Sequence, residues 1–433
     1  MHRRQWLHHS ACALAAVAGH PGWARAASPS SEVSVLHWWT SLGEDLAKQV
    51  LVDELHARGL QWRDFAVPGG AGVAAVKVLR NRLLMGQPPD MAQLIGSTLH
   101  AWVEAGLVMP LTAVAQTLRW DQQLLPSISQ HIMHRGQAMA VPLGIHRINN
   151  LFINREVFAA HGLALPRQWR DVFVAAEVLR RAGINPLAWS DQPWQIATVF
   201  ETMLLGDVGP ARYRTLVQQQ DRALWHDDAV RRSLLRLVKL RELCVNRPAE
   251  RDWGACTRDL FDGRAAMMIM GDWVRGELQA MGGEGMRGFA CLPTPGTERM
   301  HLYSLDSLSL LHKVTLAPDR PLSLAQALTD ATTQQRYNAA KGSVPVLRHA
   351  DLGAMSACAQ ASWRDFSSPA FERAPSLAHR MAGSEAFKDH VAHVVWRHAT
   401  GQQRNPSETQ RRLGAAVRAT EHQPLGTPSC EAC

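Results

Sequence analysis

The chain has 433 residues, 46% of them hydrophobic, and a formal net charge of +8 at pH 7. This length exceeds what one small hydrophobic core needs, so we expect two lobes or two domains. Lys and Arg are scattered among acidic residues, and no basic helix interleaved with aromatic residues occurs. This distribution argues against a nucleic-acid-binding protein, and we expect no nucleic-acid partner.

Residues 1–27 have the pattern of a signal peptide. A positively charged start, a short apolar stretch and a small-x-small cleavage site follow one another as Arg3-Arg4, Cys12–Ala18 and Ala24-Arg25-Ala26. The segment from Arg3 to Leu7 also resembles a twin-arginine export signal, so the export route stays open. The apolar stretch is too short to span a bilayer, and no later run of about 18 apolar residues occurs. We therefore expect an exported, soluble, periplasmic protein.

Strands and helices alternate in the part of the chain that follows. The apolar pattern predicts strands at 33–39, 65–67 and 90–95, helices at 45–58 and 73–84, and a glycine loop at 68–72. This β-α-β-α-β order predicts a parallel sheet of the α/β class.

The later part of the chain is more helical. The pattern predicts a crossing segment at 140–144, a strand at 150–154, helices between 168 and 241, a helix at 259–270 whose end could instead be a strand, a strand at 305–315, and a loop-like tail beyond 413. No internal repeat or long linker interrupts the chain. We therefore expect interleaved lobes, an N-terminal one from 28–142 and 298–350 and a C-terminal one from 143–297 and 351–433.

Eight short motifs occur in a consistent order along the chain. They are Leu36–Thr40, Phe65–Val67 with its glycine loop, Gly86–Asp90, Trp102–Gly106, Val141-Pro142 with His146-Arg147-x-Asn149, Met270–Trp273, Asn338–Pro345 and Pro375–His379. With these motifs, nearly the whole mature chain resembles the family 1 extracellular solute-binding proteins of carbohydrate ABC transporters, in their glucose/mannose-binding branch. The resemblance implies a two-lobe α/β periplasmic-binding-protein fold, type II-like, with a ligand cleft between lobes joined by hinge strands.

The resemblance also implies which side chains contact the sugar. They are Trp38, Trp39, Glu44, Trp273, Asp306, Lys341 and His379. Trp rings stack on the C–H faces of a sugar, carboxylates accept hydrogen bonds from its hydroxyls, Lys donates and His can do either. The composition fits this use, with 15 Trp against 10 Phe and 3 Tyr, although a single Trp is more often a core residue. Because Trp38 and Trp39 are consecutive in a strand, one of them could belong to the core.

Two positions depart from the glucose/mannose branch. Ile95 stands where that branch carries a lysine, and Gly72-Val73 stands where an acidic residue is usual. Losing one charge-assisted hydrogen bond costs about 1.5–3 kcal/mol, or roughly ten- to a hundredfold in affinity. The identity of the sugar therefore stays open.

The resemblance implies a monosaccharide ligand and the membrane permease subunits of an ABC importer as partners. We expect a monomer without cofactor, metal or catalytic residue. A sensor built on the same clamp and an exported carbohydrate-active enzyme are the alternatives, but no carboxylate pair of a glycosidase can be chosen from the sequence. Gly70-x-Gly72-x-x-Ala75 matches a dinucleotide fingerprint only weakly, and we interpret it as a turn. His390 and His393 share a helical face, which is more typical of a solvated surface than of a metal site.

Cysteine use agrees with an oxidising compartment without fixing any pairing. Six of the seven cysteines remain once Cys12 is removed with the signal peptide. Cys430 and Cys433 have the spacing of a redox motif, but they end the chain in a segment that we expect to be frayed.

Overall fold

The computed structural model describes residues 31–69, 72–244, 251–283, 286–312 and 317–421. The predicted signal peptide, Gly70 of the glycine loop and the Cys430–Cys433 pair lie outside the described residues. Among the described helices, none has both the length and the apolar character needed to cross a membrane.

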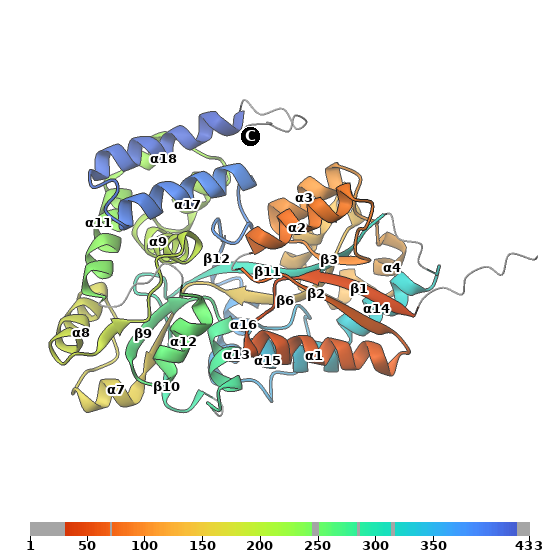
Figure 1. Ribbon diagram of the computed structural model, residues 1–433, viewed down its shortest axis with the longest axis horizontal. Helices are drawn as coiled ribbons and strands as arrows, with labels where there is room; N and C mark the ends of the chain where they lie inside the picture. Colours follow the sequence, from red (N-terminus) through yellow and green to blue (C-terminus); the bar gives the residue numbers. More distant parts are fainter. Residues whose placement is uncertain (1–30, 70–71, 245–250, 284–285, 313–316, 422–433) are drawn as a thin grey trace, which may run out of the picture.

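The first lobe is built on a mixed, six-stranded sheet (Figure 1). The order is β12-β11-β3-β1-β2, with β6 also paired to β11. The strands are β1 Glu32–His37, β2 Gln61–Ala66, β3 Met91–Gln93, β6 Val141–Arg147, β11 Met300–Leu310 and β12 Glu372–Pro375. Strands β2 and β3 pair with β1 in parallel, which confirms the predicted βαβαβ start, whereas β11 runs antiparallel to β3 and β6.

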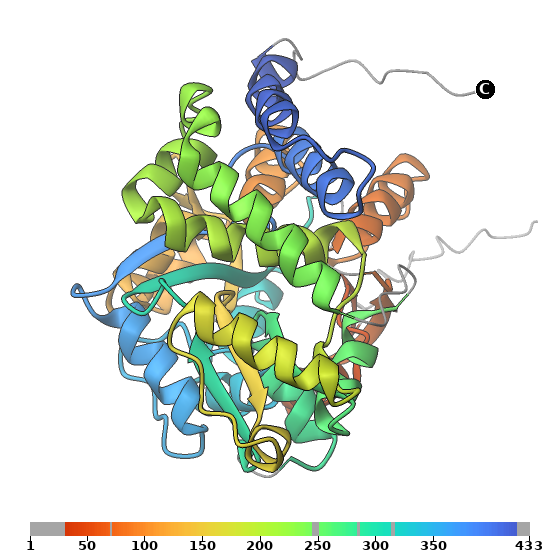
Figure 2. The ribbon, with the colours of Figure 1, turned by 90° about the vertical axis from the view of Figure 1, so that its left-hand side faces the viewer.

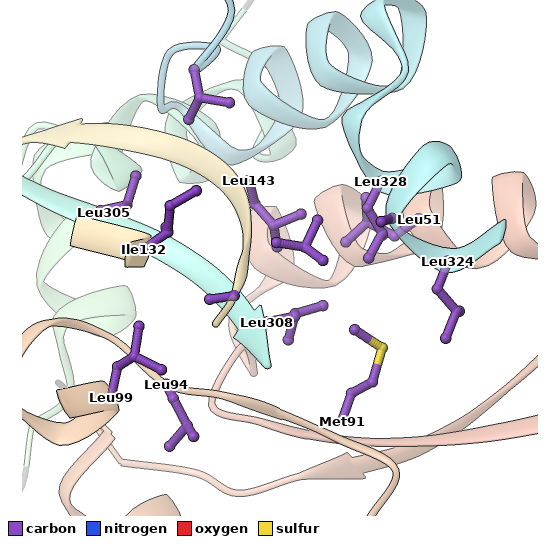
Figure 3. Close-up of a cluster of buried hydrophobic side chains, with 14 of the residues drawn as sticks. Leu51, Met91, Leu94, Leu99, Ile132, Leu143, Leu305, Leu308, Leu324 and Leu328 are labelled. Carbon is purple, nitrogen blue, oxygen red and sulfur yellow. The ribbon is translucent and has the colours of Figure 1, made fainter. Parts of the chain in front are cut away.

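Helices cover this sheet and enclose the first core. They are α1 Leu42–Ala57, α2 Val73–Leu84, α3 Gly96–Glu104, α4 Thr112–Thr117, α5 Trp120–Gln123, α6 Pro126–Ile132, α14 Arg320–Thr329, α15 Ala331–Lys341 and α16 Ala357–Ser367, and a small hairpin joins β4 Met133–His134 to β5 Gln137–Ala138. Helix α1 buries Ala47, Leu51 and Leu55, one helical turn apart, against the sheet. Figure 3 shows Leu51 in the same cluster as Leu308 of β11 and Leu324 of α14.

The second lobe is built on a four-stranded sheet with the order β10-β7-β9-β8. These strands are β7 Asn150–Asn154, β8 Asn185–Leu187, β9 Ala265–Met270 and β10 Phe289–Pro293. The surrounding helices are α7 Arg155–Ala160, α8 Trp169–Arg181, α9 Pro193–Val208, α10 Pro210–Val217, the short 3₁₀ helix η2 Ala223–His226, α11 Asp228–Leu243, α12 Trp253–Phe261, α13 Trp273–Ala280, α17 Glu385–Ala399 and α18 Pro406–Glu421. Figures 1 and 2 show α17 and α18 side by side at one end of this lobe.

Two predicted elements are compared with the structure here. A helix through Met270 is wrong, because α12 ends at Phe261 and the chain turns at Gly263, whose φ of 72° favours glycine, whereas the alternative of a strand at the end of this stretch is confirmed. Residues Ala265–Met270 then form β9, and all of them are buried. A strand buried on both faces shows no polar alternation, so its sequence does not distinguish it from a buried helix. The loop-like tail predicted beyond 413 is wrong as far as Glu421, where α18 ends, and its remainder lies outside the described residues.

The chain crosses between the two lobes in three places. It leaves the first sheet between Arg147 and Asn150, returns between Pro293 and Met300, and leaves again after Pro375 towards α17. A disulfide adds a covalent link, because it joins Cys291 of β10 to Cys358 of α16. Helix α16 packs in the first core, although the predicted boundary at residue 350 assigns it to the other lobe. The remaining lobe boundaries stay a prediction.

Two further contacts join the lobes. Helix α13 of the second lobe lies against α1 and α15 of the first at three glycines, where a Cβ would meet opposing backbone at 2.7 Å from Gly43, 2.4 Å from Gly276 and 2.4 Å from Gly342. We call this set the glycine contact. At the start of α3, the amide of Ser97 donates to the carbonyl of Arg380 at 2.8 Å, and the Thr98 hydroxyl donates to Glu385 at 2.7 Å. Gly96 at the start of α3 also lies close to backbone, since a Cβ there would meet the carbonyl of Arg380 at 1.9 Å. The lobes are therefore joined at two places in addition to the crossing segments and the disulfide.

Candidate functional site

A cavity of about 690 Å³ lies between the two lobes. Residues of both lobes line it, and six of the seven predicted sugar contacts are among them, namely Trp38, Glu44, Trp273, Asp306, Lys341 and His379. The structure thus brings together side chains that are up to 341 positions apart in the sequence (379 minus 38). Their contacts with a sugar stay a prediction.

The seventh residue, Trp39, does not line the cavity. Its side chain is 1% exposed and belongs to the first core, where its ring stacks on His37 with a centroid distance of 5.0 Å. The prediction that Trp39 lies in the cleft is therefore wrong. Consecutive residues of extended chain point to opposite sides, so that Trp38 faces the cavity and Trp39 faces the core.

Trp38 is held by the glycine loop. Gly72 has a φ of 68°, and a Cβ there would lie 2.7 Å from the Trp38 ring. Only glycine adopts this conformation and this close approach without strain. The glycines that match a dinucleotide fingerprint therefore include one whose role is to pack on the Trp38 ring.

Glu44 and Lys341, which both line the cavity, form a buried ion pair. One carboxylate oxygen of Glu44 accepts from the amides of Thr40 and Ser41, at 3.0 and 3.2 Å, and completes a capping box at the start of α1. The other oxygen lies 2.8 Å from Nζ of Lys341. Burial opposes the charge on Lys341, but the carboxylates of Glu44 and Asp306 outweigh it and raise the pKa of Lys341. The cavity therefore offers a charged donor and a charged acceptor side by side.

His146 joins two carboxylates where the chain crosses between the lobes. Its Nδ1 lies 2.6 Å from Asp272 of the second lobe, and its Nε2 lies 3.1 Å from Asp306 of β11. Burial disfavours a charged imidazole, but the two carboxylates raise the pKa of His146 to about 9. Burial likewise opposes the charge on Asp306, and His146 lowers the pKa of Asp306 to about 2. At neutral pH this buried cluster therefore holds a cation between two anions.

His146 should account for part of the stability that the fold loses as the pH rises above neutral. Because its pKa rises from 6.5 to about 9 on folding, its contribution is fully present below 6.5 and is lost as the pH rises through 9. We expect the melting temperature of the wild type to fall between about pH 6 and about pH 9.5, and to fall less steeply in His146→Gln. Thermal unfolding followed by circular dichroism checks this, and parallel curves for the two proteins would contradict it.

Aromatic side chains of the second lobe lie beside the cluster of His146, Asp272 and Asp306. Trp273, the first residue of α13, has ring centroids 5.4 Å from His146, 5.1 Å from His379 and 6.4 Å from Trp253. His379 is buried, and burial together with the neighbouring charge on His146 lowers the pKa of His379 to about 3. A neutral imidazole beside indole faces suits contact with an uncharged ligand that has both hydroxyls and C–H faces.

Several cavity residues carry no motif and were not identified from the sequence. They are Ile95, Gln192, Trp194, Asp252, Trp253, Arg258 and Glu277, of which Ile95 was singled out only as a departure from the family. The high tryptophan content was the one pointer to Trp194 and Trp253. Trp194 is oriented by a hydrogen bond from its Nε1 to Gln192 at 2.7 Å, and Trp253 opens α12 beside its N-cap Asp252.

Metal ligation finds little support in the described part of the chain. No group of three or more His, Cys, Asp or Glu side chains there is arranged to hold a metal ion. His390 bonds to the carbonyl of Arg412 at 3.2 Å, and His393 lies against Trp396. The two histidines thus have separate protein neighbours.

Comparison with known proteins gives consistent matches. The family model described as "Bacterial extracellular solute-binding protein" matches residues 47–304. A protein of Brucella suis biovar 1 (strain 1330), named "Probable sugar-binding periplasmic protein", is 30% identical over 95% of this chain and 97% of its own length. A protein of the same name from Rhizobium meliloti (strain 1021) is 30% identical over 92% of this chain and 96% of its own length.

Solved structures share the fold. A bacterial solute receptor with a preference for β-D-galactopyranose superimposes with a TM-score of 0.77 at 14% identity, over 90% of this chain and 99% of its own. A chitin oligosaccharide binding protein gives a TM-score of 0.75 at 16% identity over 90% of this chain and 99% of its own. These matches confirm the predicted two-lobe α/β architecture.

Proposed function

Because the chain belongs to the family of bacterial extracellular solute-binding proteins, we propose that it is the periplasmic sugar-binding component of an ABC importer. In this proposal residues 1–27 direct export, the protein acts as a monomer, and it delivers its ligand to membrane permease subunits. The ligand is a monosaccharide of the glucose or mannose type, bound in the interlobe cavity. Relatives named as periplasmic sugar-binding proteins, aligned over nearly their whole length, support the location and the ligand class.

One observation carries the proposal. Indole rings of Trp38 and Trp273 border the same cavity as the charged pair of Glu44 and Lys341 and the carboxylate of Asp306. Apolar ring faces and charged hydrogen-bonding groups together match a molecule with C–H faces and many hydroxyls. A purely apolar or purely charged ligand would use only half of this lining.

The charge state of Asp306 excludes this residue as the general acid of a glycosidase, although an ionised carboxylate could still serve as nucleophile or base. Glycoside hydrolysis needs a carboxylic acid that keeps its proton near neutral pH. His146 lowers the pKa of Asp306 to about 2, although burial works in the opposite direction, so this carboxylate stays ionised. A sensor that binds sugar in the same cleft without delivering it to a permease is the second candidate.

Isothermal titration against a panel of sugars tests the proposal. The panel includes D-glucose, D-mannose, D-galactose, D-xylose and maltose. Micromolar or tighter binding of a monosaccharide, without any product in the mixture afterwards, is the expected result. Hydrolysis of maltose would favour an enzyme. No binding to any sugar would overturn the assignment.

Ile95 gives a second, sharper test. Its side chain is 5% exposed and lines the cavity, so a lysine there would place an ammonium group beside the ligand. We expect Ile95→Lys to strengthen D-glucose binding by roughly ten- to a hundredfold, the worth of one charge-assisted hydrogen bond. Ile95→Met, which changes shape without adding a donor, is the matched control. Unchanged or weaker binding in Ile95→Lys would show that the ligand presents no acceptor at this position.

A further inference from the structure

A buried carboxylate outside the cavity holds the segment that carries His379. Glu201 lies on α9, is 4% exposed, and receives hydrogen bonds from the segment after β12. Its Oε1 accepts from the Ser376 hydroxyl at 2.5 Å, and its Oε2 accepts from the amides of Leu377 at 2.9 Å and Ala378 at 3.1 Å. The Tyr213 hydroxyl donates to the same Oε2 at 3.0 Å.

We propose that Glu201 is a positioning residue of the sugar site, which fixes the backbone at 376–378 so that His379 presents its ring to the cavity. The inference rests on the proposed function. Glu201 does not line the cavity and touches no ligand position. Its effect on a sugar must therefore pass through the segment that it holds.

A continuous path of hydrogen bonds links the two residues. The Ser376 hydroxyl donates to Glu201 and accepts from the backbone amide of His379 at 3.1 Å. The ring of His379 is held from the same helix, because its Nε2 lies 3.0 Å from the hydroxyl of Thr198, which is three residues before Glu201. Helix α9 thus holds His379 at two points, at its backbone amide through Glu201 and Ser376, and at its ring through Thr198.

The contact with Thr198 occupies Nε2 of His379. The Thr198 hydroxyl has one hydrogen and two neighbours that can accept it, the carbonyl of Trp194 at 2.8 Å and Nε2 of His379 at 3.0 Å. If it donates to Trp194, Nε2 carries the proton and Nδ1 accepts; if it donates to Nε2, Nδ1 carries the proton and donates. No described residue bonds to Nδ1, so the positioned ring presents this nitrogen to a ligand hydroxyl.

Only a carboxylate serves all the donors around Glu201. An ionised carboxylate has two accepting oxygens, whereas an amide in its place has one oxygen and one donating NH₂ group. In Glu201→Gln, an NH₂ group would face either the Ser376 hydroxyl or the two backbone amides. Burial raises the pKa of Glu201 to about 7, although the surrounding donors work in the opposite direction. The ionised form with two accepting oxygens therefore predominates above about pH 7.

The first experiment needs no ligand. Hydrogen exchange followed by mass spectrometry on the full chain should show the amides of residues 377–379 exchanging at least tenfold faster in Glu201→Gln than in the wild type. Ser233→Ala is the matched control, since Ser233 is buried in the same lobe and bonds to Asp207 and Ala229 rather than to this segment. Unchanged exchange in Glu201→Gln would overturn the proposal.

The second experiment uses whichever panel sugar the wild type binds. We expect Glu201→Gln to weaken binding about tenfold, and the double variant with His379→Ala to bind no more weakly than His379→Ala alone. A merely structural role would give additive losses instead, and that result would overturn the proposal.

Ser376→Ala serves as the second variant if Glu201→Gln fails to fold. It removes the middle link and should show the same non-additivity with His379→Ala. If the wild type binds no sugar, the proposed function fails, while the exchange experiment still decides whether Glu201 holds this segment.

Discussion

Replacing Asp272 with alanine is expected to lower the free energy of unfolding by about 3–5 kcal/mol. Asp272 is 0% exposed and accepts from Nδ1 of His146 at 2.6 Å, from the amide of Arg147 at 2.9 Å and from Nη2 of Arg275 at 3.3 Å. Removing the carboxylate leaves two buried cationic side chains without this partner. The loss therefore reflects uncompensated charge more than lost contact area.

Urea denaturation followed by circular dichroism at pH 7 measures this loss. Glu177→Ala is the control, because Glu177 is 42% exposed and pairs with Arg180, itself 48% exposed, where removal of an ion pair costs less than about 1 kcal/mol. A loss of similar size in both variants would show that His146 and Arg275 do not depend on Asp272.

Removing the disulfide is the second change with a large expected effect. Cys291 and Cys358 are 67 residues apart, and closing a loop of that length stabilises a fold by about 4 kcal/mol in the chain-entropy model. We expect the double variant Cys291→Ser and Cys358→Ser to lose about 2–4 kcal/mol of unfolding free energy. The segment closed by the disulfide contains β11, α14 and α15, which all belong to the first lobe. The disulfide therefore stabilises the part of the fold where the chain comes back from the second lobe to the first.

Denaturation with and without a thiol reductant tests the disulfide. The wild type in reductant should match the double variant, and the double variant itself should not respond to reductant. Equal midpoints for the oxidised wild type and the double variant would contradict the expectation.

Local sequence patterns were sufficient for the helix predicted at 73–84, which is α2, Val73–Leu84, and has an exposed face. They were also sufficient for the strand predicted at 150–154, which is β7, Asn150–Asn154, because an asparagine marks each end of this short strand although all five residues are buried. They were insufficient for β9, because both of its faces are buried and the alternation that marks a strand is lost. Pairing of β11 with β3 and β6 likewise depends on residues more than 150 positions apart (308 minus 141), which no local pattern encodes.

The site was predictable to the extent that motifs mark it. Trp38, Trp273, Lys341 and His379 lie in motifs of the family, Glu44 follows the first motif closely, and Asp306 was assigned from the overall resemblance. The structure brings all six to one cavity. Side chains alternate in direction along an extended chain, so Trp38 and Trp39 are expected to point to opposite sides. This alternation does not tell which of the two faces the core. Trp253 and Glu201 carry no motif, and their positions depend on how α12 and α9 pack.

The glycine contact has a consequence for how the lobes move. At Gly43, Gly276 and Gly342 the backbones of α1, α13 and α15 touch, and two side chains of α13 bond at the same contact, Glu277 to the amide of Gly43 at 2.8 Å and Arg275 to the carbonyl of Gly342 at 3.0 Å. Close backbone packing together with these hydrogen bonds resists separation, so we expect the lobes to stay in contact here when they move. The hydrogen bonds between α3 and the start of α17 are individually weak and can break. If those bonds break, a rotation of one lobe about the glycine contact displaces the edge of the cavity at α3 and α17 more than it displaces the glycine contact itself.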